Sequence, residues 1–183
     1  MLTGWSGCGK DAAATLMVEE MGFRRVAFAD AVKQECAIIY GIPVERFYSG
    51  KDRPLERHIH CYPIARTPRE LLLLHALDER AKDDALYARM VVDEIRDGIG
   101  DSDINRIVIS DWRYRVELET IRSAFPDARI ITVRIQRPGI QQSTHPSEHE
   151  LDTMVPHFTL RNDGSISDLR DALKSLLRHY ITR

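Results

Sequence analysis

The chain has 183 residues, of which 43% are hydrophobic and 30% are charged, and its formal net charge at pH 7 is -2. These values predict one globular domain with a single core, and so small a net charge gives no electrostatic reason to expect binding to a nucleic-acid polymer. No apolar run approaches the length of a membrane span and no signal peptide precedes the first motif, so we expect a cytoplasmic protein without a membrane partner.

The cysteines Cys8, Cys36 and Cys61 lie far apart in the chain and form no CxxC pair. This spacing predicts neither a disulfide framework nor a zinc site. It favours a reducing compartment, in agreement with the expected cytoplasmic location.

Residues Gly4 to Asp11 (GWSGCGKD) match the GxxxxGK pattern of a phosphate-binding loop. In such a loop the glycines let successive backbone N–H groups point at phosphate oxygens, the lysine adds a cation, and the next helix presents its positive end. The helix-forming run 12–21, with a stop at Gly22, supplies that helix. The loop predicts a nucleotide polyphosphate as ligand, and the alternative is a glycine-rich turn that binds nothing.

Only Met1, Leu2 and Thr3 precede Gly4, whereas a buried parallel strand usually has about five residues. We therefore expect either a short central strand or native residues upstream of Met1. Beyond the loop, segments typical of strands and helices alternate along the chain. The expected strands are 25–28, 106–110, 129–135 and 158–160, and 49–67 is expected to be a loop. The expected helices are 31–40, 68 to about 77, 86–95, about 116–125 and 166–180, and Ser165 with Asp168 is expected to cap the last of them.

This alternation predicts an α/β fold of the P-loop NTPase type, a single domain over 1–183 with three layers: helices on both faces of a parallel sheet of about five strands. Ligands of such sheets bind at the carboxyl ends of the strands. We therefore expect the phosphate loop, Asp111 and the segment after Ile135 to share one cleft.

Two aspartates are candidate ligands of Mg²⁺. Asp111 ends an apolar strand, where a phosphate-loop enzyme places the carboxylate that holds the ion, although Asp there can also cap the next helix. Asp11 follows Lys10 at the place where a hydroxyl usually contacts Mg²⁺. Its carboxylate can ligate the ion or complement the positive end of the helix, and the two readings stay open.

Basic side chains are concentrated between residues 51 and 69, which suggests a docking place for a second, phosphate-bearing substrate. The alternative is a solvated face. Among these cations we favour Arg69, because it is fixed at the start of a helix. The others are Lys51, Arg53, Arg57 and Arg66, with His58 and His60 as surface residues.

The stretch from 136 to 150 is polar and contains Arg137, His145 and Glu148. Such a segment after a central strand can close as a lid over a transferring phosphoryl group, which excludes water as a competing acceptor. A zinc site at His145 and His149 is the minor alternative.

These motifs, in this order, resemble the deoxynucleoside monophosphate kinase family of bacteriophages and related viruses, in the adenylate-kinase-like branch of phosphate-loop kinases. The resemblance covers nearly the whole chain. It rests on the loop ending Gly9-Lys10-Asp11, FADAVK (28–33), PRELL from Pro68, the pattern Asp111-x-Arg113-x-x-x-Glu117, Arg137-Pro138-Gly139, His145-x-x-Glu148 and Asn162-Asp163-Gly164.

The resemblance implies ATP on the loop, a deoxynucleoside monophosphate in the facing cleft, and Mg²⁺ bridging the donor phosphates. It also implies an acceptor-binding region over about 41–80 and a lid-like insertion over about 136–150. The implied ATP-binding residues are Gly4, Ser6, Gly7, Cys8, Gly9, Lys10, Asp11, Ala12 and, near the adenine, Asn162. The implied acceptor-side residues are Asp30, Lys33, Arg69, Glu117, His145 and Glu148, with Lys10, Arg69, Asp111, Arg113 and Arg137 at the transfer itself.

For Asp30, Lys33, Arg113 and Glu117 the alternative is helix capping and ion pairing within a helix. Two departures from the family pattern concern the site. Ala12 stands where relatives have Thr, and His75-Ala76-Leu77 stands where they have Leu-Gly-Thr, which leaves acceptor base recognition open. A phosphomevalonate-kinase-like enzyme and a non-catalytic nucleotide-binding protein are the competing readings, and a homodimer stays open.

Overall fold

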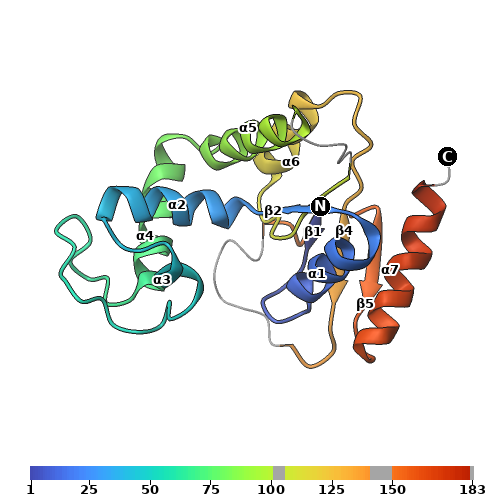
Figure 1. Ribbon diagram of the computed structural model, residues 1–183, viewed down its shortest axis with the longest axis horizontal. Coiled ribbons are helices and arrows are strands. Elements are labelled where there is room, and N and C mark those ends of the chain that lie inside the picture. The colour runs from blue at the N-terminus through green and yellow to red at the C-terminus, as the bar shows by residue number, and fades with distance from the viewer. Residues whose placement is uncertain (101–105, 141–149, 182–183) are drawn as a thin grey trace.

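The protein is described by a computed structural model that covers residues 1–100, 106–140 and 150–181 (Figure 1). The strands and helices follow one another in the predicted order, with the short helix α3 as an addition. The strands are β1 (Leu2–Thr3), β2 (Arg24–Val26), β3 (Ile107–Ile109), β4 (Val133–Gln136) and β5 (Phe158–Arg161). The helices are α1 (Lys10–Met21), α2 (Phe28–Tyr40), α3 (Glu45–Tyr48), α4 (Pro68–Lys82), α5 (Leu86–Gly100), α6 (Arg115–Ala124) and α7 (Ile166–Ile181).

Every strand pair is parallel, as expected, but the strands form two sheets rather than one. One sheet has the order β1-β4-β5 and the other pairs β2 with β3. The two sheets adjoin just beyond the end of β3, where the backbone N–H of Trp112 donates to the Leu2 carbonyl at 3.0 Å. The expected single sheet of about five strands is therefore interrupted between β1 and β3. β1 has only two residues, and this hydrogen bond connects it to the segment after β3 in place of a strand pairing.

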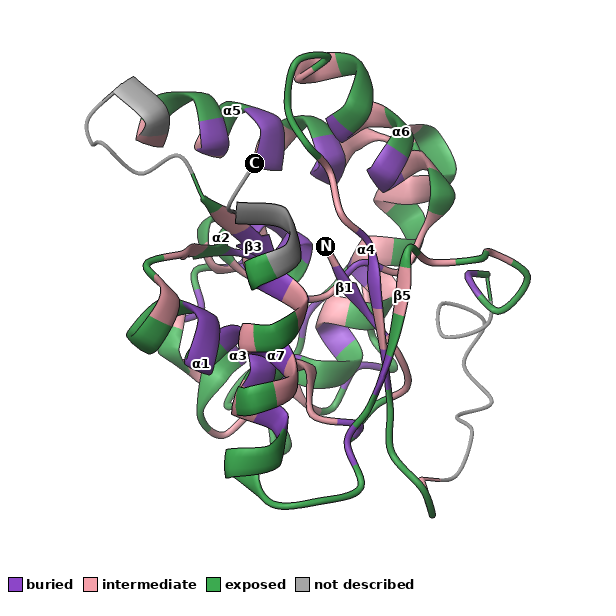
Figure 2. Cartoon of the chain, turned by 90° about the vertical axis from the view of Figure 1, so that its right-hand side faces the viewer, coloured by how far each residue is buried: buried purple, intermediate pink, exposed green. Residues whose placement is uncertain are grey.

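Helices cover both faces of the strands. On one face α1 and α7 pack against β1, β4 and β5. On the other face α5 and α6 pack against β2 and β3 and the residues that follow these strands (Figure 1). Neighbours in β3 face opposite ways, since Val108 lies in the first cluster and Ile109 in the second. Figure 2 shows buried and exposed stretches alternating along α1, α5 and α6, as amphipathic helices require. The three-layer α/β arrangement is thus present.

A third hydrophobic cluster joins α2, α3 and α4 beside the strands, and Figure 1 shows these helices extending away from them. Phe47 from α3 and Leu71 from α4 are fully buried in it, together with Tyr87 from α5. The sequence did not predict α3, whose four residues end directly before the loop expected from residue 49. This part of the molecule includes the region 41–80 that the family resemblance assigns to the acceptor.

The boundary between β2 and α2 differs from the one that the sequence predicts. The strand expected at 25–28 ends at Val26, and the helix expected from Ala31 begins at Phe28. The cause is a cap from a distant residue: the Asp111 carboxylate accepts the backbone N–H groups of Phe28 and Ala29 at 2.9 and 2.8 Å.

Other boundaries follow local rules more closely. The helix expected to end near Leu77 continues to Lys82, and it begins with a capping box in which Thr67 and Glu70 exchange hydrogen bonds. The predicted capping pair Ser165 and Asp168 is confirmed by reciprocal bonds at the start of α7. The strand expected at 129–135 is shorter, because β4 begins at Val133, opposite Leu2 of its partner β1. Within the described ranges, no helix combines the length and apolar character needed to cross a bilayer.

Candidate phosphate-binding site

The loop between β1 and α1 has the backbone that a phosphate cradle needs. Gly4, Gly7 and Gly9 have positive φ angles of 134°, 79° and 105°. A Cβ on Gly9 would lie 2.2 Å from Nδ2 of Asn162, and one on Gly4 would lie 2.3 Å from the Ile135 carbonyl oxygen. These positions therefore require glycine for both conformation and space.

Lys10 is the first residue of α1, and its ammonium folds over the loop. Its Nζ donates to the carbonyls of Gly4 and Trp5 at 2.6 and 3.0 Å. Gly9 is the N-cap residue, and no side-chain hydrogen bond caps this end of α1. The first amides of α1 thus face a place where an anionic ligand can accept their hydrogen bonds.

Asn162, predicted to lie near an adenine, connects the loop to β5. Its Nδ2 donates to the Cys8 carbonyl at 2.9 Å, and its backbone N–H donates to the Gln136 carbonyl at 2.7 Å. Cys8 is buried, with its Sγ 3.9 Å from Nζ of Lys10. The ends of β4 and β5 are therefore held against the phosphate loop. Of the other predicted ATP-binding positions, Ser6 is exposed on the loop and Ala12 is half-buried on α1.

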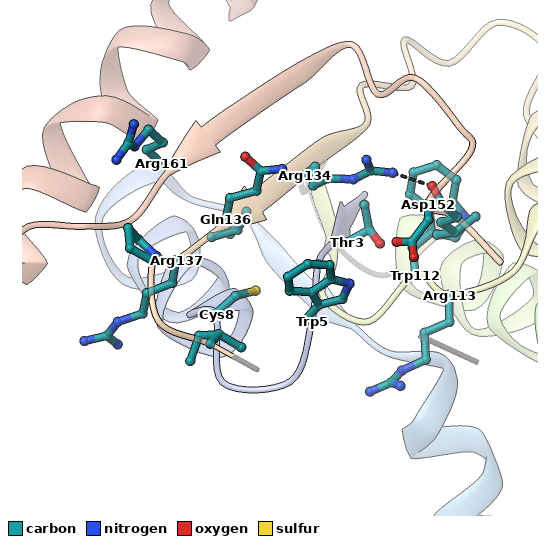
Figure 3. A pocket seen from close by; sticks show the side chains of 15 residues that line it. Thr3, Trp5, Cys8, Trp112, Arg113, Arg134, Gln136, Arg137, Asp152 and Arg161 are labelled. Carbon is teal, nitrogen blue, oxygen red and sulfur yellow. Dashed lines mark hydrogen bonds between the residues drawn. The ribbon is translucent and has the colours of Figure 1, made fainter. Parts of the chain in front are cut away.

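A pocket of about 300 Å³ opens beside the loop, where the strand ends meet. Figure 3 shows Trp5 between Arg113, which follows β3, and Arg137, which follows β4. The loop, the Asp111 segment and the residues after Ile135 thus lie together, as expected. Among the side chains that line the pocket are two tryptophans and four arginines: Trp5, Trp112, Arg113, Arg134, Arg137 and Arg161.

Arg134 and Arg161 are engaged by neighbouring groups. Arg134 donates to the carbonyls of Leu151 and Met154, and Arg161 forms an ion pair with Asp163 at 3.0 Å. Sequence reasoning missed Trp112 and Arg161 as pocket residues, although each stands next to a residue that it singled out, Asp111 and Asn162. Adjacency to those motifs was the available signal.

Asp111 caps a helix, although not the one expected. Its two carboxylate oxygens accept N–H groups of α2, whereas the sequence suggested a cap for the helix after β3. Burial raises the pKa of Asp111, and the two hydrogen bonds oppose this shift. Because each carboxylate oxygen has a second lone pair, capping leaves acceptor capacity for a cation.

The residues around Asp111 fit a magnesium ion that shares its ligands with phosphates. Mg²⁺ usually binds one or two carboxylates together with phosphate oxygens and water. Among the described residues no group of His, Cys, Asp and Glu could hold a metal alone. The hydroxyl of Ser110, next to Asp111, is buried and has no hydrogen-bond partner there, and Asp11 lies exposed in the first turn of α1. Ser110 and Asp111 directly precede the pocket residues Trp112 and Arg113, and Asp11 follows the loop lysine, so the residue types that such an ion prefers flank the pocket and the loop.

Three charged residues near the start of α2 form an ion-pair cluster. Asp30 contacts Lys33 at 2.7 Å and Arg25 at 2.8 Å, and Lys33 lies 3.9 Å from the ring centre of Tyr48. Burial lowers the pKa of Arg25, but the hydrogen bond and charge of Asp30, with the charges of Asp111 and Asp11, raise it overall. Arg25, which the sequence did not single out, therefore interacts electrostatically with Asp111 and Asp11, the two predicted metal ligands.

Arg69 lies at the exposed start of α4 and does not line the pocket. Its guanidinium pairs with both carboxylate oxygens of Asp52, at 2.5 and 3.0 Å. The fork that was expected to hold an acceptor phosphate therefore holds a carboxylate, a group with similar geometry.

Glu117 is fully buried and fixes the turn that carries Arg113. One carboxylate oxygen accepts the N–H groups of Arg113 and Tyr114 at 2.8 and 3.0 Å, and the other meets Arg80 at 2.6 Å. Burial raises the pKa of Glu117 to about 7, although the charge of Arg80 opposes the shift. Arg80 gave no signal in the sequence, because its partner lies 37 residues away.

His75, which departs from the family pattern, is a buried residue of α4. Its ring nitrogens contact the Tyr40 hydroxyl at 2.8 Å and the Glu35 carboxylate at 2.9 Å. The Tyr87 hydroxyl donates to the same carboxylate oxygen. His75 therefore connects α2 to α4, and neither of its ring nitrogens is left for a ligand. His145, Glu148 and the alternative zinc ligand His149 lie outside the described residues, as does most of the expected lid.

Together the fold and the loop define a phosphate-loop α/β protein, and comparisons with known proteins agree. The chain is 28% identical over 189 aligned residues to a protein of Acanthamoeba polyphaga mimivirus named "Putative deoxynucleotide monophosphate kinase", covering 91% of this chain and 89% of the relative. The resemblance to the deoxynucleoside monophosphate kinase family is thereby confirmed. No family model matches the chain.

Solved structures resemble the whole chain at low identity. TT1252 from Thermus thermophilus superimposes with a TM-score of 0.52 at 17% identity, covering 98% of this chain and 95% of its own. Dephospho-CoA kinase from Campylobacter jejuni gives a TM-score of 0.49 at 12% identity, covering 97% and 94%. At 17% identity the likeness to TT1252 shows the fold alone.

Proposed function

We propose that the protein is an ATP-dependent kinase that transfers a phosphoryl group to a deoxynucleoside monophosphate. The observation that carries the proposal is a glycine-dependent phosphate loop at the mouth of an arginine-lined pocket. The similarity to the mimivirus protein, which spans 91% of the chain, supports the choice of acceptor. In the reaction, an oxygen of the acceptor phosphate bonds to the γ-phosphorus of ATP, the bond between that phosphorus and the β–γ bridging oxygen breaks, and ADP leaves.

The donor side would be the loop and α1. The first amides of α1 and the ammonium of Lys10 would bind the donor phosphates, after Lys10 leaves the loop carbonyls. Asp111, with Asp11 nearby, would hold Mg²⁺, which neutralises negative charge on the phosphates when bound. Asn162 would fix the adenine side, because it joins the loop to the end of β5.

The acceptor side would be the region 41–80 with the start of α2. Arg69 would exchange Asp52 for the acceptor phosphate, while Asp30 and Lys33 line the same substrate. Arg113 and Arg137, on the two sides of Trp5, would stabilise the transferring group. An acceptor phosphate is already an anion at neutral pH, so positioning and charge neutralisation suffice and no strong base is needed. His145 and Glu148 belong to this proposal as lid residues of the segment 136–150.

The proposal further includes a single domain over 1–183, one five-stranded sheet joined at the Trp112–Leu2 bond, and a cytoplasmic enzyme of nucleotide metabolism. Its partners would be ATP and the monophosphate, without a nucleic-acid polymer or a membrane. Assembly as a homodimer is a separate question that sedimentation would answer.

A coupled assay for ADP with ATP, Mg²⁺ and each common deoxynucleoside monophosphate tests the function. We expect ADP to form with at least one of them. Phosphomevalonate is the comparison acceptor, because His75-Ala76-Leu77 stands where relatives have Leu-Gly-Thr, which leaves recognition of the acceptor base open. ADP formed only with phosphomevalonate would refute the choice of acceptor, and ATP binding by calorimetry without any turnover would favour a non-catalytic protein.

A further inference from the structure

Arg80, in the last turn of α4, connects two parts of the molecule through one buried carboxylate. Its Nη2 meets Oε1 of Glu117 at 2.6 Å, and the two side chains are 14% and 1% exposed. Its guanidinium also lies 3.9 Å from the ring centre of Tyr114 and 5.6 Å from that of Tyr87. The guanidinium is thus held by a charge and two aromatic faces, contacts that Lys cannot all reproduce.

The other oxygen of Glu117 determines where the Arg113 turn lies. It accepts the backbone N–H groups of Arg113 and Tyr114, the two residues between Trp112 and the start of α6. Arg113 lines the pocket beside the phosphate loop. The position of its guanidinium therefore depends on a carboxylate that Arg80 holds in place.

Helix α4 carries both contacts of interest, one at each end. Arg69 is in its first turn and Arg80 in its last, so the helix connects the expected acceptor-phosphate ligand with the turn of Arg113. A helix is stiff over this length, so displacement of one end is transmitted to the other. Glu117 is the only carboxylate to which the structure describes a bond from Arg80.

We propose that Arg80 is a positioning residue, which acts through Glu117 to hold Arg113 at the transfer site and to align it with the acceptor-binding helix α4. The proposal rests on the proposed kinase function for its kinetic part, but the effect on the Arg113 turn does not depend on the substrate.

The test compares Arg80→Met, Arg80→Lys and the control Arg89→Met. Arg89, in α5, is ion-paired with Asp83 at the C-terminal end of α4, but its side chain is 51% exposed and the structure describes no bond from it to Glu117. In Arg80→Met we expect kcat to fall by about 10- to 100-fold, while the KM for ATP changes by no more than about twofold, since misplacement of a transfer group mainly affects the chemical step. Arg80→Lys should recover part of kcat, and Arg89→Met should resemble the wild type.

Hydrogen–deuterium exchange at the amides of Arg113 and Tyr114 supplies a readout independent of turnover. We expect exchange there to accelerate by about tenfold or more in Arg80→Met, with little change in the amides of β4. If Arg80→Met does not fold, the same two measurements on Arg80→Lys decide, because that variant keeps the charge near Glu117.

The outcomes separate the two proposals. A wild-type protein that phosphorylates no deoxynucleoside monophosphate refutes the proposed function. Hydrogen–deuterium exchange at Arg113 and Tyr114 then tests the positioning role of Arg80 without any kinetic measurement. Wild-type kcat in a folded Arg80→Met protein, or unchanged exchange at Arg113 and Tyr114, would overturn the positioning role. A loss of thermal stability with kcat preserved would mean that Arg80 serves the fold only.

Discussion

The phosphate-loop side of the molecule and the α2–α4 side are built in different ways. The loop depends on backbone geometry: Gly4 and Gly9 have conformations and close contacts that a side chain would prevent. The α2–α4 side depends on side-chain contacts between distant residues, such as His75 with Glu35 and Arg69 with Asp52. Backbone requirements leave a pattern in the sequence, whereas side-chain networks can be rebuilt with other residues. This explains why the donor is easier to infer than the acceptor.

The largest effect should come from removing the loop cation. We expect Lys10→Ala to lower kcat by about 1000-fold or more, because its ammonium would no longer stabilise phosphate charge. The fold should survive, since the bonds described for the Lys10 ammonium stay within the loop, to the carbonyls of Gly4 and Trp5 and to Sγ of Cys8. The coupled assay measures turnover, and an unchanged circular dichroism spectrum is the control. A variant with near-normal kcat would show that the donor side is not organised around this loop.

Glu117, where the two sides meet, should make stability depend on pH. Its pKa is about 7 in the folded protein instead of 4.5, so between these values the folded state binds more protons than the unfolded state. The stabilisation by this proton is complete below pH 4.5 and is lost as the pH rises through about 7. The shift corresponds to about 3 kcal/mol at most.

This pH dependence can be isolated by comparison with Glu117→Gln, which cannot titrate. The difference in free energy of unfolding between wild type and variant should fall as the pH rises from 4.5 to 7, measured by urea denaturation. Other carboxyl groups are common to both proteins and cancel. A constant difference across this range would contradict the assignment of the raised pKa to Glu117.

A pair of glycine substitutions tests whether space or conformation matters more in the loop. Gly9→Ala combines a positive φ with a contact of 2.2 Å to Asn162, whereas at Gly22, with φ of 69°, a Cβ would meet nothing within 4 Å. We expect Gly9→Ala to destabilise the protein by about 2 kcal/mol more than Gly22→Ala does, and Gly9→Ala with Asn162→Ala to recover part of that difference. Thermal unfolding gives the comparison, and equal losses would mean that the contact is unimportant.

The smallest effect is expected on the acceptor side. Arg69→Ala should raise the KM for the monophosphate by about tenfold and leave that for ATP nearly unchanged, because one charge-assisted phosphate contact is lost. Asp52→Ala is the matched control, since it releases the guanidinium and should not raise the KM of the acceptor. Similar increases in both KM values would count against an acceptor role for Arg69.

The features that the sequence predicted well are those encoded within a few residues. The capping pair Ser165 and Asp168 and the phosphate loop belong to this class. The parallel arrangement of the strands was also predicted, but from the order of strands and helices along the whole chain. The start of α2 was wrong by three residues because its cap, Asp111, is 83 residues from Phe28. No rule of local sequence can supply such a partner.

The same limit applies to the candidate site. The Arg80–Glu117 pair, the Asn162 bond to the loop and the two tryptophans of the pocket all depend on chain segments that meet only after folding. The motif residues could be named from spacing, but their partners could not. The departure at His75 could be seen in the sequence, whereas its buried contacts with Tyr40 and Glu35 could not.

Both tryptophans of this chain, Trp5 and Trp112, line the same pocket. Trp5 is half-buried on the loop, and Trp112 is buried with its indole N–H bonded to the Tyr114 carbonyl at 2.7 Å. All of the indole emission of the protein therefore originates beside the phosphate loop. Tryptophan fluorescence is therefore an intrinsic probe of that site. A change in its emission wavelength or intensity on adding a nucleotide can be followed without any label.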